Sequence, residues 1–210
     1  MKVPAHNRQA VRSLAPRVTE AQAIEAFEKG VWRAIRGEPL RSIAAAYLPF
    51  RLYEVAVTNG GKRTVSIFAI DAVTASLDLY EFEHVPVGTE IVTVESANAL
   101  PPGVDEAHSL TLLEDKVRRA IFQTGFFRVR NLEVRPRRLP VDLHIPYWLA
   151  FYGEGDRARL RVMDAVRRQM EGAKARALFE DWLLDRLAYG PAGDVRTLAA
   201  LTAAQSPGDG

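Results

Sequence analysis

The sequence contains no cysteine in its 210 residues. Disulfide bonds, thiolate metal ligands and a cysteine nucleophile are therefore excluded, because each of them needs a thiol. Long hydrophobic runs are also absent, since charged residues interrupt every apolar stretch before it reaches the roughly eighteen residues that cross a membrane. The first thirty residues lack the apolar segment of a signal peptide. These absences predict a cytoplasmic protein without a membrane span.

A large excess of one charge is missing too. The chain has 28 Lys and Arg against 26 Asp and Glu, so the charge total does not predict a nucleic-acid partner. The four histidines show no ligand spacing, and no HExxH motif, phosphate-binding glycine loop or nucleophile elbow occurs. We therefore predict no cofactor and no metal from motifs, and the sequence identifies no catalytic residue.

What the chain does contain is a repeated pattern. Residues 48–53 (LPFRLY) lead through a polar turn to 70–73 (IDAV), and residues 145–150 (IPYWLA) lead through another to 163–166 (MDAV). The prolines are 97 residues apart and the aspartates 93. A nearly constant offset predicts an internal duplication. A further match, RAI at 33–35 and at 119–121, has an offset of 86 and requires an insertion between the two matches.

The first copy is predicted to follow a flexible basic arm at residues 1–17. Residues 18–96 are predicted to form a helix and an antiparallel meander. Thr19 and Gln22 have capping-box spacing, and apolar residues at every third or fourth position continue to about residue 36. Strands are predicted near 47–57, 65–70, 77–82 and 90–95, and an Asn-Gly turn joins the first two.

The second copy is predicted to follow a linker at residues 97–108, which contains two prolines and a glycine. Residues 109–190 form the second unit in this interpretation. Thr111 and Glu114 make another capping box, a helix runs to about residue 123, and strands lie near 126–134, 146–152 and 157–162. Helical periodicity from 165 to 189 predicts a long amphipathic C-terminal helix, and 191–210 a short helix and a disordered tail. The predicted fold is α+β, with two related units of a helix and an antiparallel sheet.

The order of a helix, an aromatic-rich strand, a returning strand and an Asp-Ala-Val-Thr turn resembles that of the small PepSY-like domain. The turn is IDAVT at residues 70–74, and Ala75 stands where the turn of that family places glycine. The resemblance covers residues 19–82 and, more faintly, 111–166. It implies the shape of one unit and assigns no functional residue.

Asp71 and Asp164 are the acidic residues that recur at equivalent positions of the two copies. Paired carboxylates can hold a metal or divide the roles of acid and base, so a site at the boundary between the copies is one hypothesis. The alternative is that each carboxylate accepts backbone N–H groups in the turn that follows its strand, as Asp does in many turns.

Arginines cluster in the second half of the chain and alternate on one predicted strand. Arginine interleaved with aromatic residues can neutralise phosphates and stack on bases. The alternative is a set of solvated strand faces. The arginines of the nucleic-acid hypothesis are Arg128, Arg130, Arg135, Arg137, Arg138, Arg157, Arg159 and Arg161.

Aromatic residues recur at the start of each predicted hairpin. They can line a ligand groove or a partner surface, or they can pack in the core. The candidates for a partner surface are Tyr53, Tyr147, Trp148 and Tyr152.

The sequence thus favours a binding or accessory module for a protein or peptide partner, which acts through sheet edges and this aromatic face. Nucleic-acid binding and an enzyme or metal site at the boundary between the copies remain the alternatives.

Overall fold

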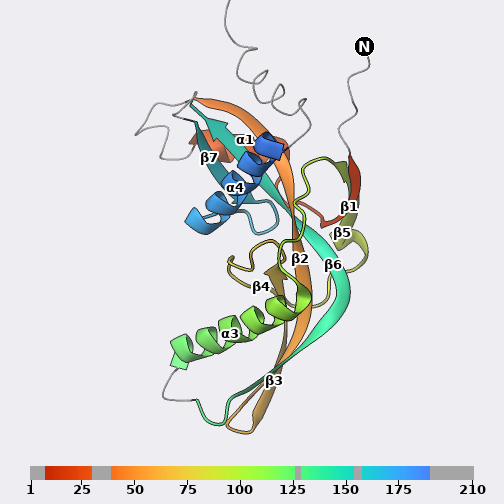
Figure 1. Ribbon diagram of the computed structural model, residues 1–210, viewed down its shortest axis with the longest axis vertical. Coiled ribbons are helices and arrows are strands. Elements are labelled where there is room, and N and C mark those ends of the chain that lie inside the picture. The colour runs from red at the N-terminus through yellow and green to blue at the C-terminus, as the bar shows by residue number, and fades with distance from the viewer. Residues whose placement is uncertain (1–7, 30–38, 126–128, 154–157, 190–210) are drawn as a thin grey trace, which may run out of the picture. The chain divides into compact units, whose positions relative to one another are not determined.

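A computed structural model describes residues 8–29, 39–125, 129–153 and 158–189 of the chain (Figure 1). The fold is α+β, with a sheet in which antiparallel strand pairs predominate. In chain order the elements are β1 (Gln9–Leu14), α1 (Glu20–Lys29), β2 (Leu40–Asn59), β3 (Lys62–Asp71), β4 (Tyr80–Phe82), the short 3-10 turn η1 (Gly88–Glu90), β5 (Ile91–Ser96), α3 (Glu106–Gly125), β6 (Glu133–Tyr152), β7 (Arg159–Asp164), β8 (Gln169–Met170) and α4 (Ala173–Tyr189).

The chain forms two compact units, and neither is continuous in sequence. Unit 1 consists of Met1–Arg8, Pro16–Ala46 and Tyr147–Gly210, and unit 2 of Gln9–Ala15 and Tyr47–Pro146. Two of the four boundaries lie on either side of β1, and the other two fall inside the long strands β2 and β6, which are orange and teal in Figure 1. Each unit therefore contains the first part of one long strand and the last part of the other.

Unit 2 is built on the hairpin of β2 and β3, in the sheet order β4-β3-β2-β6-β1-β5. The hairpin register runs from Phe50↔Asp71 to Asn59↔Lys62. Gly60 and Gly61 between the strands have φ values of 57° and 82°, which a two-residue hairpin turn requires and which glycine adopts without strain. The Asn-Gly signal in the sequence therefore located this turn correctly.

The core of unit 2 lies between α3 and this hairpin. Leu113 and Val117, one helical turn apart, are buried against Tyr53, Val55 and Ile70. In Figure 1, α3 (green) lies alongside the part of the sheet that contains β2 and β3. Burial of this apolar stripe supplies the main stabilisation of the unit, at roughly 25 cal/mol for each Å² of apolar surface.

Unit 1 has a hairpin of its own, formed by the end of β6 and by β7, and β8 pairs with β7. Helix α1 covers it, with Ala23 and Phe27 buried against Ala150 and Met163. The predicted capping box at the start of α1 is confirmed. Thr19 N–H donates to Gln22 Oε1 at 3.0 Å, and Gln22 N–H donates to Thr19 Oγ1 at 3.3 Å.

The predicted capping box at the start of the second helix is wrong. Helix α3 begins at Glu106, and its cap is Asp105, whose Oδ1 accepts the N–H of His108 at 2.7 Å. Thr111 lies inside the helix and donates its hydroxyl to Ala107 O. Asp is at least as good a cap as Thr, and it stands closer to the prolines that end the preceding extended segment. The predicted linker thus contains the first turn of α3.

The other differences from the sequence prediction concern strands. Residues 9–14, assigned to the flexible arm, form β1 and pair with β5. Residues 133–152 form one continuous strand in spite of three prolines. A strand tolerates proline where the proline nitrogen faces no neighbouring strand. The edge of β6 that faces β1 is largely of this kind, because β1 pairs with β6 only at Ser13↔His144. The C-terminal helix begins at Ala173 rather than at residue 165. Three predicted segments lie outside the described residues: the arm at 1–7, the continuation of the first helix over 30–36, and the tail after 190.

Candidate functional site

Asp71 is fully buried, and its carboxylate is used by the turn that follows β3. Oδ1 accepts the N–H groups of Thr74 and Ala75, both at 2.8 Å, and Oδ2 accepts the N–H of Leu77 at 2.9 Å. Three backbone donors that the turn leaves without a ladder partner are satisfied in this way. The local structure agrees with the turn interpretation of this aspartate.

Asp164 has the same role after β7 in unit 1. It is fully buried, and its Oδ1 accepts the N–H groups of Val166 and Arg167, both at 2.7 Å. Asp71 belongs to unit 2 and Asp164 to unit 1. Among the described residues, no group of three or more His, Asp or Glu side chains is arranged to hold a metal ion.

Two of the four aromatic residues proposed as a partner surface lie in the core. Tyr53 has no exposed surface and Tyr147 has 2 %. Trp148 is half-buried and donates its Nε1–H to Val18 O at 2.9 Å. Tyr152 donates its hydroxyl to Phe27 O at 3.1 Å and lines a pocket. Of this set, Tyr152 is therefore the residue that the structure places at a candidate site.

The arginines of unit 2 are engaged with acidic or carbonyl groups. Arg135 pairs with Glu133 at 2.9 Å and Arg137 with Glu54 at 3.2 Å. Arg138 is mostly buried, pairs with Asp142, donates to three carbonyl oxygens and has its guanidinium 5.5 Å from the centre of the Tyr53 ring.

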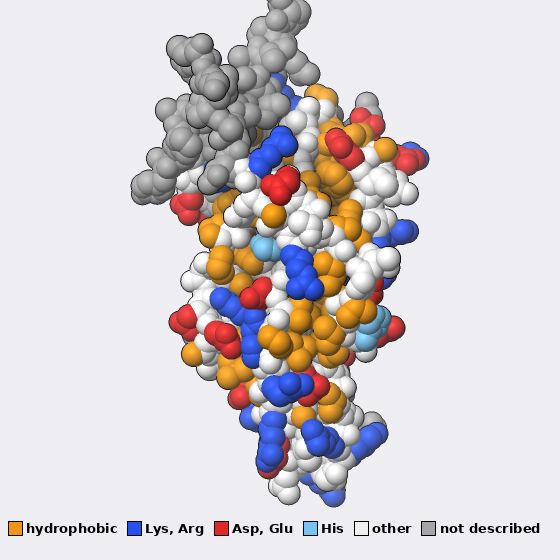
Figure 2. Space-filling view, turned by 90° about the vertical axis from the view of Figure 1, so that its right-hand side faces the viewer, with side chains coloured by type: hydrophobic (Ala, Val, Ile, Leu, Met, Phe, Trp, Pro, Cys, Tyr) orange, Lys and Arg blue, Asp and Glu red, His pale blue; other side chains and the backbone are white. Residues whose placement is uncertain are grey.

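Arg130 uses its backbone rather than its side chain in the contacts described, since its N–H donates to Asn59 Oδ1 and its carbonyl accepts from Gly60. Arg128 and Arg157 lie outside the described residues. On the face in Figure 2, basic side chains are interspersed with acidic and apolar ones.

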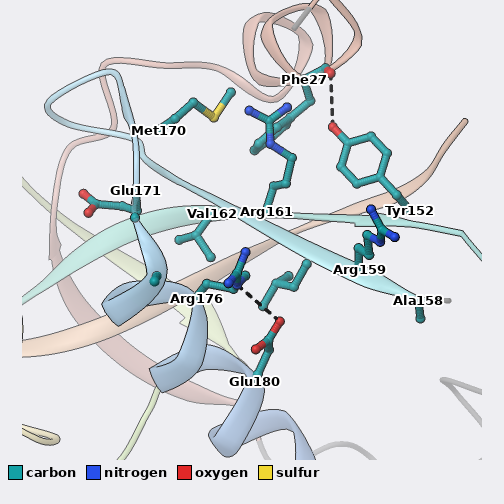
Figure 3. A pocket seen from close by; sticks show the side chains of 13 residues that line it. Phe27, Tyr152, Ala158, Arg159, Arg161, Val162, Met170, Glu171, Arg176 and Glu180 are labelled. Carbon is teal, nitrogen blue, oxygen red and sulfur yellow. Dashed lines mark hydrogen bonds and ion pairs between the residues drawn. The ribbon is translucent and has the colours of Figure 1, made fainter. Parts of the chain in front are cut away.

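Arg159 and Arg161 lie in a different setting, at a pocket of about 660 Å³ in unit 1 (Figure 3). The pocket follows the edge of β7. Residues 159–162 of β7 form one wall, and residues 170–173, which connect β8 to α4, form another. Side chains from α1 and α4 complete it: Phe27, Arg176 and Glu180.

The hydrogen bonds of β8 determine which backbone groups of β7 face this edge. Glu171 N–H donates to Val162 O at 2.9 Å, and Arg168 N–H donates to Asp164 O at 3.0 Å. The N–H and C=O of one strand residue face the same neighbour, and successive residues alternate. Leu160 therefore directs its N–H and C=O to the same side as Val162, where β8 has ended.

Within the described residues, the strand pairing of β7 at Leu160 is with β6 alone. This backbone donor and acceptor consequently lie at an open edge. An extended peptide bonds to such an edge in strand addition.

The two faces of β7 give the pocket different chemistry. Leu160 and Val162 are buried, and Val162 is on the side of α4 in Figure 3. Arg161 points the other way, toward α1, with its guanidinium carbon 5.9 Å from the centre of the Phe27 ring. Arg159 shares that face, because it is two residues away on the strand. One face is thus apolar and the other basic.

Electrostatics at the pocket centre on Arg161 and Tyr152. Burial raises the pKa of the Tyr152 phenol, and the neighbouring Arg161 guanidinium opposes this shift. The carboxylate of Glu28 raises the same pKa. At the α4 side, Arg176 Nε lies 3.8 Å from Glu180 Oε1. In the parts of the chain that the structure describes, Arg161 contacts an aromatic ring and a phenol but forms no ion pair.

The sequence prediction contained some members of this site but not the site itself. Tyr152 was assigned to an aromatic surface, and Arg159 and Arg161 to a basic one. The contributions of Phe27 and Arg176 were missed, because they come from helices far away in sequence. The available signal was the alternation of arginine with small or apolar residues over 157–162, which placed the arginines on one strand face.

Comparison of the chain with protein-family models, with curated proteins and with solved structures finds no match. None of the helices in the described ranges is long and apolar enough to span a membrane.

Proposed function

We propose that this protein is a binding module that captures an extended segment of a protein or peptide partner at the edge of β7. The observation that supports the proposal most directly is the position of the pocket. It lies where the Leu160 backbone groups face outward and where β8 pairs only with Met163 and Asp164 of the strand. The pocket volume of about 660 Å³ is in the range of ligand sites and holds several residues of a strand.

The flanking elements favour an extended occupant. Phe27 of α1 lies on one face of β7, and Arg176 of α4 lies on the other. A strand that is added at this edge has alternate side chains on these two faces, so each face can select for side-chain type. Backbone hydrogen bonds then contribute affinity, and the two faces contribute specificity.

Nucleic-acid binding through the Arg-rich strands is the weaker alternative. The side chains of Arg135, Arg137 and Arg138 pair with carboxylates of the same unit, which reduces the charge available to phosphates. A mobility-shift titration with single-stranded DNA at low salt separates the two proposals. We expect no salt-sensitive complex. A complex that weakens steeply with salt and that Arg137→Glu disrupts would favour nucleic acid instead.

We also propose that units 1 and 2 derive from an internal duplication of a PepSY-like shape. Ala72 O accepts two consecutive N–H groups, from residues 103–104, at 2.9 and 3.0 Å. Ala165 O, 93 positions later, accepts two from residues 17–18, at 2.8 and 3.0 Å. In both units the accepting turn follows a buried Asp, and the donating segment leads directly into a capped helix.

The offsets found in the sequence support the same proposal. The caps Thr19 and Asp105 are 86 residues apart, as are the RAI matches. The strands β2 and β6 have 20 residues each and begin 93 residues apart. The offset of 86 between the helices and the offset of 93 between the long strands are consistent with one duplication if the second copy has seven additional residues between its helix and its long strand. Ala75 and Arg168 have φ values of 54° and 61° at equivalent turn positions.

The binding proposal is tested with random dodecapeptides displayed on phage and selected on the full chain. Enriched peptides are synthesised, and each backbone nitrogen is methylated in turn. Strand addition predicts that alternate N-methyl groups weaken binding by about tenfold, because every second amide faces the edge. The other N-methyl groups are expected to change affinity little. Failure to enrich any peptide, or a loss without two-residue periodicity, would contradict the proposal.

A further inference from the structure

We propose that the segment bound at the β7 edge alternates acidic and apolar residues, with its carboxylates on the Arg161 face. This inference rests on the proposed function and names the chemistry of the partner. It begins from Leu160, whose N–H and C=O face the open edge. A partner residue that exchanges hydrogen bonds with Leu160 places its two neighbours opposite Arg159 and Arg161.

The basic face of the groove is built to receive a carboxylate. Arg161 is half-buried, with its guanidinium held over the Phe27 ring at 5.9 Å and beside the Tyr152 hydroxyl. These contacts orient the planar group but do not neutralise it. Glu28, exposed on α1, raises the pKa of Tyr152, and Glu171 also lines the pocket. A guanidinium fixed in this way binds a carboxylate with two parallel hydrogen bonds at little entropic cost.

The opposite face of the groove selects apolar residues. Leu160 and Val162 lie there with 6 % and 2 % of their surfaces exposed. Met170 is directly opposite Met163 and therefore lies on the other face, with Phe27 and Arg161. On the α4 side, Arg176 and Glu180 pair with each other, so that this rim carries no net charge from the pair. The partner residue that pairs with Leu160 therefore gains most by being apolar.

A second copy of the chain fits this edge less well than an acidic segment. Two β7 strands paired antiparallel about Leu160 place Arg159 of one copy opposite Arg161 of the other. Like charges directly opposite in a strand pair are destabilising. Charge complementarity therefore favours a partner strand with carboxylates at those two positions.

The experiment uses four blocked heptapeptides and the full chain labelled with 15N. The peptides are TVEVEVT, TVSVSVT, TVKVKVT and TVVEEVT, the last with the composition of the first but without alternation. Titrations follow the Leu160 amide resonance, which a strand at this edge must shift. We expect TVEVEVT to bind about tenfold more tightly than TVSVSVT and TVVEEVT, and TVKVKVT to bind most weakly. The preference for glutamate should decrease with salt.

Charge reversal in the protein completes the test. Arg161→Glu leaves one cation, Arg159, and one anion on this face and is expected to abolish the difference in affinity between TVEVEVT and TVKVKVT. Arg63→Glu on β3, outside the pocket, should leave that difference unchanged. The circular dichroism spectrum of each variant shows whether it has folded. Arg161→Gln provides a second, milder variant that should reduce the preference for TVEVEVT without abolishing it.

The outcomes separate this inference from the proposed function. Equal affinity for the four peptides, with the Leu160 amide shifted, overturns the acidic preference and leaves strand addition in place. Equal binding of TVEVEVT and TVVEEVT overturns the alternation. If neither these peptides nor phage-selected ones shift Leu160, both proposals fail. A concentration-dependent dimer that Arg161→Glu strengthens would identify a second copy as the occupant and overturn the inference.

Discussion

Glu171 donates its backbone N–H to the carbonyl oxygen of Val162 at 2.9 Å, and beyond this bond β7 continues without β8. This bond shows that the backbone N–H and C=O of Val162 face the outer edge of β7. Because the direction alternates from residue to residue, the N–H and C=O of Leu160 face the same edge. The side chains of Arg159 and Arg161 consequently share a face with Phe27. A single hydrogen bond at the end of a two-residue strand thus determines which groups the candidate site presents.

Replacement of the buried turn aspartates is expected to reduce stability in both units. Asp71→Ala leaves three backbone N–H groups without their acceptor and should lower the free energy of unfolding by about 3 kcal/mol. Asp164→Ala removes the acceptor of two and should cost about 2 kcal/mol. Urea denaturation measures both.

Asparagine is the matched control at each aspartate, because it keeps one carbonyl oxygen as an acceptor. Asp71→Asn and Asp164→Asn should therefore lose less than the alanine variants. Alanine variants as stable as the original chain would contradict the structural role of both carboxylates.

Arg168→Gly is expected to stabilise the protein. Arg168 has a φ of 61°, a left-handed conformation that costs a residue with a Cβ about 1 kcal/mol or more. Glycine adopts this φ without strain but loses more entropy on folding, so we expect a gain of up to about 1 kcal/mol. Arg168→Ala keeps the Cβ and should give no gain. Equal thermal stability of the two variants would show that the backbone conformation is not the source of the effect.

Gly103→Ala is expected to destabilise unit 2. A Cβ at this position would lie 2.6 Å from Val73 O, a backbone atom that cannot move aside without distorting the turn after β3. We expect a loss of about 2 kcal/mol in the free energy of unfolding. Gly172→Ala is the control, because nothing lies within 4 Å of its added Cβ, and its effect should stay within about 0.5 kcal/mol. Similar losses at both positions would refute the steric explanation.

Stability should fall in mild acid because of His144. Burial lowers the pKa of its imidazole below the ordinary value of 6.5, although the carbonyl of Arg12 and the carboxylate of Asp142 oppose the shift. The unfolded chain therefore binds a proton at a higher pH than the folded chain does. Neutral His144 therefore makes its full contribution to the free energy of unfolding above about pH 6.5. This contribution decreases as the pH falls toward the pKa of the folded state, and below that pKa it changes no further.

The measurement is the free energy of unfolding as a function of pH for the original chain and for His144→Gln. Between pH 6.5 and the folded pKa, the variant should show a smaller decrease than the original chain. An NMR titration of the His144 ring measures that pKa directly. A ring that titrates at or above its ordinary value would contradict the expectation.

Local signals in the sequence predicted those parts of the fold that depend on few neighbouring residues. The Thr19 box, the turn at Gly60 and Gly61, and the alternation in the hairpins all act within about ten residues of chain. The Thr111 box failed because Asp105 offers a competing cap a few residues earlier, and the helix extends to the first good one. Such competition is decided by the free energy of the whole helix rather than by one motif.

The candidate site was less predictable, because its residues come from both ends of unit 1. Tyr53 and Tyr147 matched the pattern of a partner surface, but aromatic side chains bury so much apolar area that they pack in cores whenever a helix covers them. Within the described residues, the edge of β7 at Leu160 has no pairing strand, and no signal in the sequence predicts this. The open edge exists because the turn after Asp164 returns only two residues to pair with β7.

The division of β2 and β6 between the units has a consequence for synthesis on the ribosome. Phe27 of α1 is made early, but the strands against which it packs, with Ala150 and Met163, emerge more than one hundred residues later. Unit 2 must likewise wait for residues 133–146 of β6. Folding of unit 1 is therefore expected to be delayed until almost the whole chain has emerged. A chain truncated before β6 would expose the apolar face of α1, whereas α3 would still have β2 and β3 to pack against.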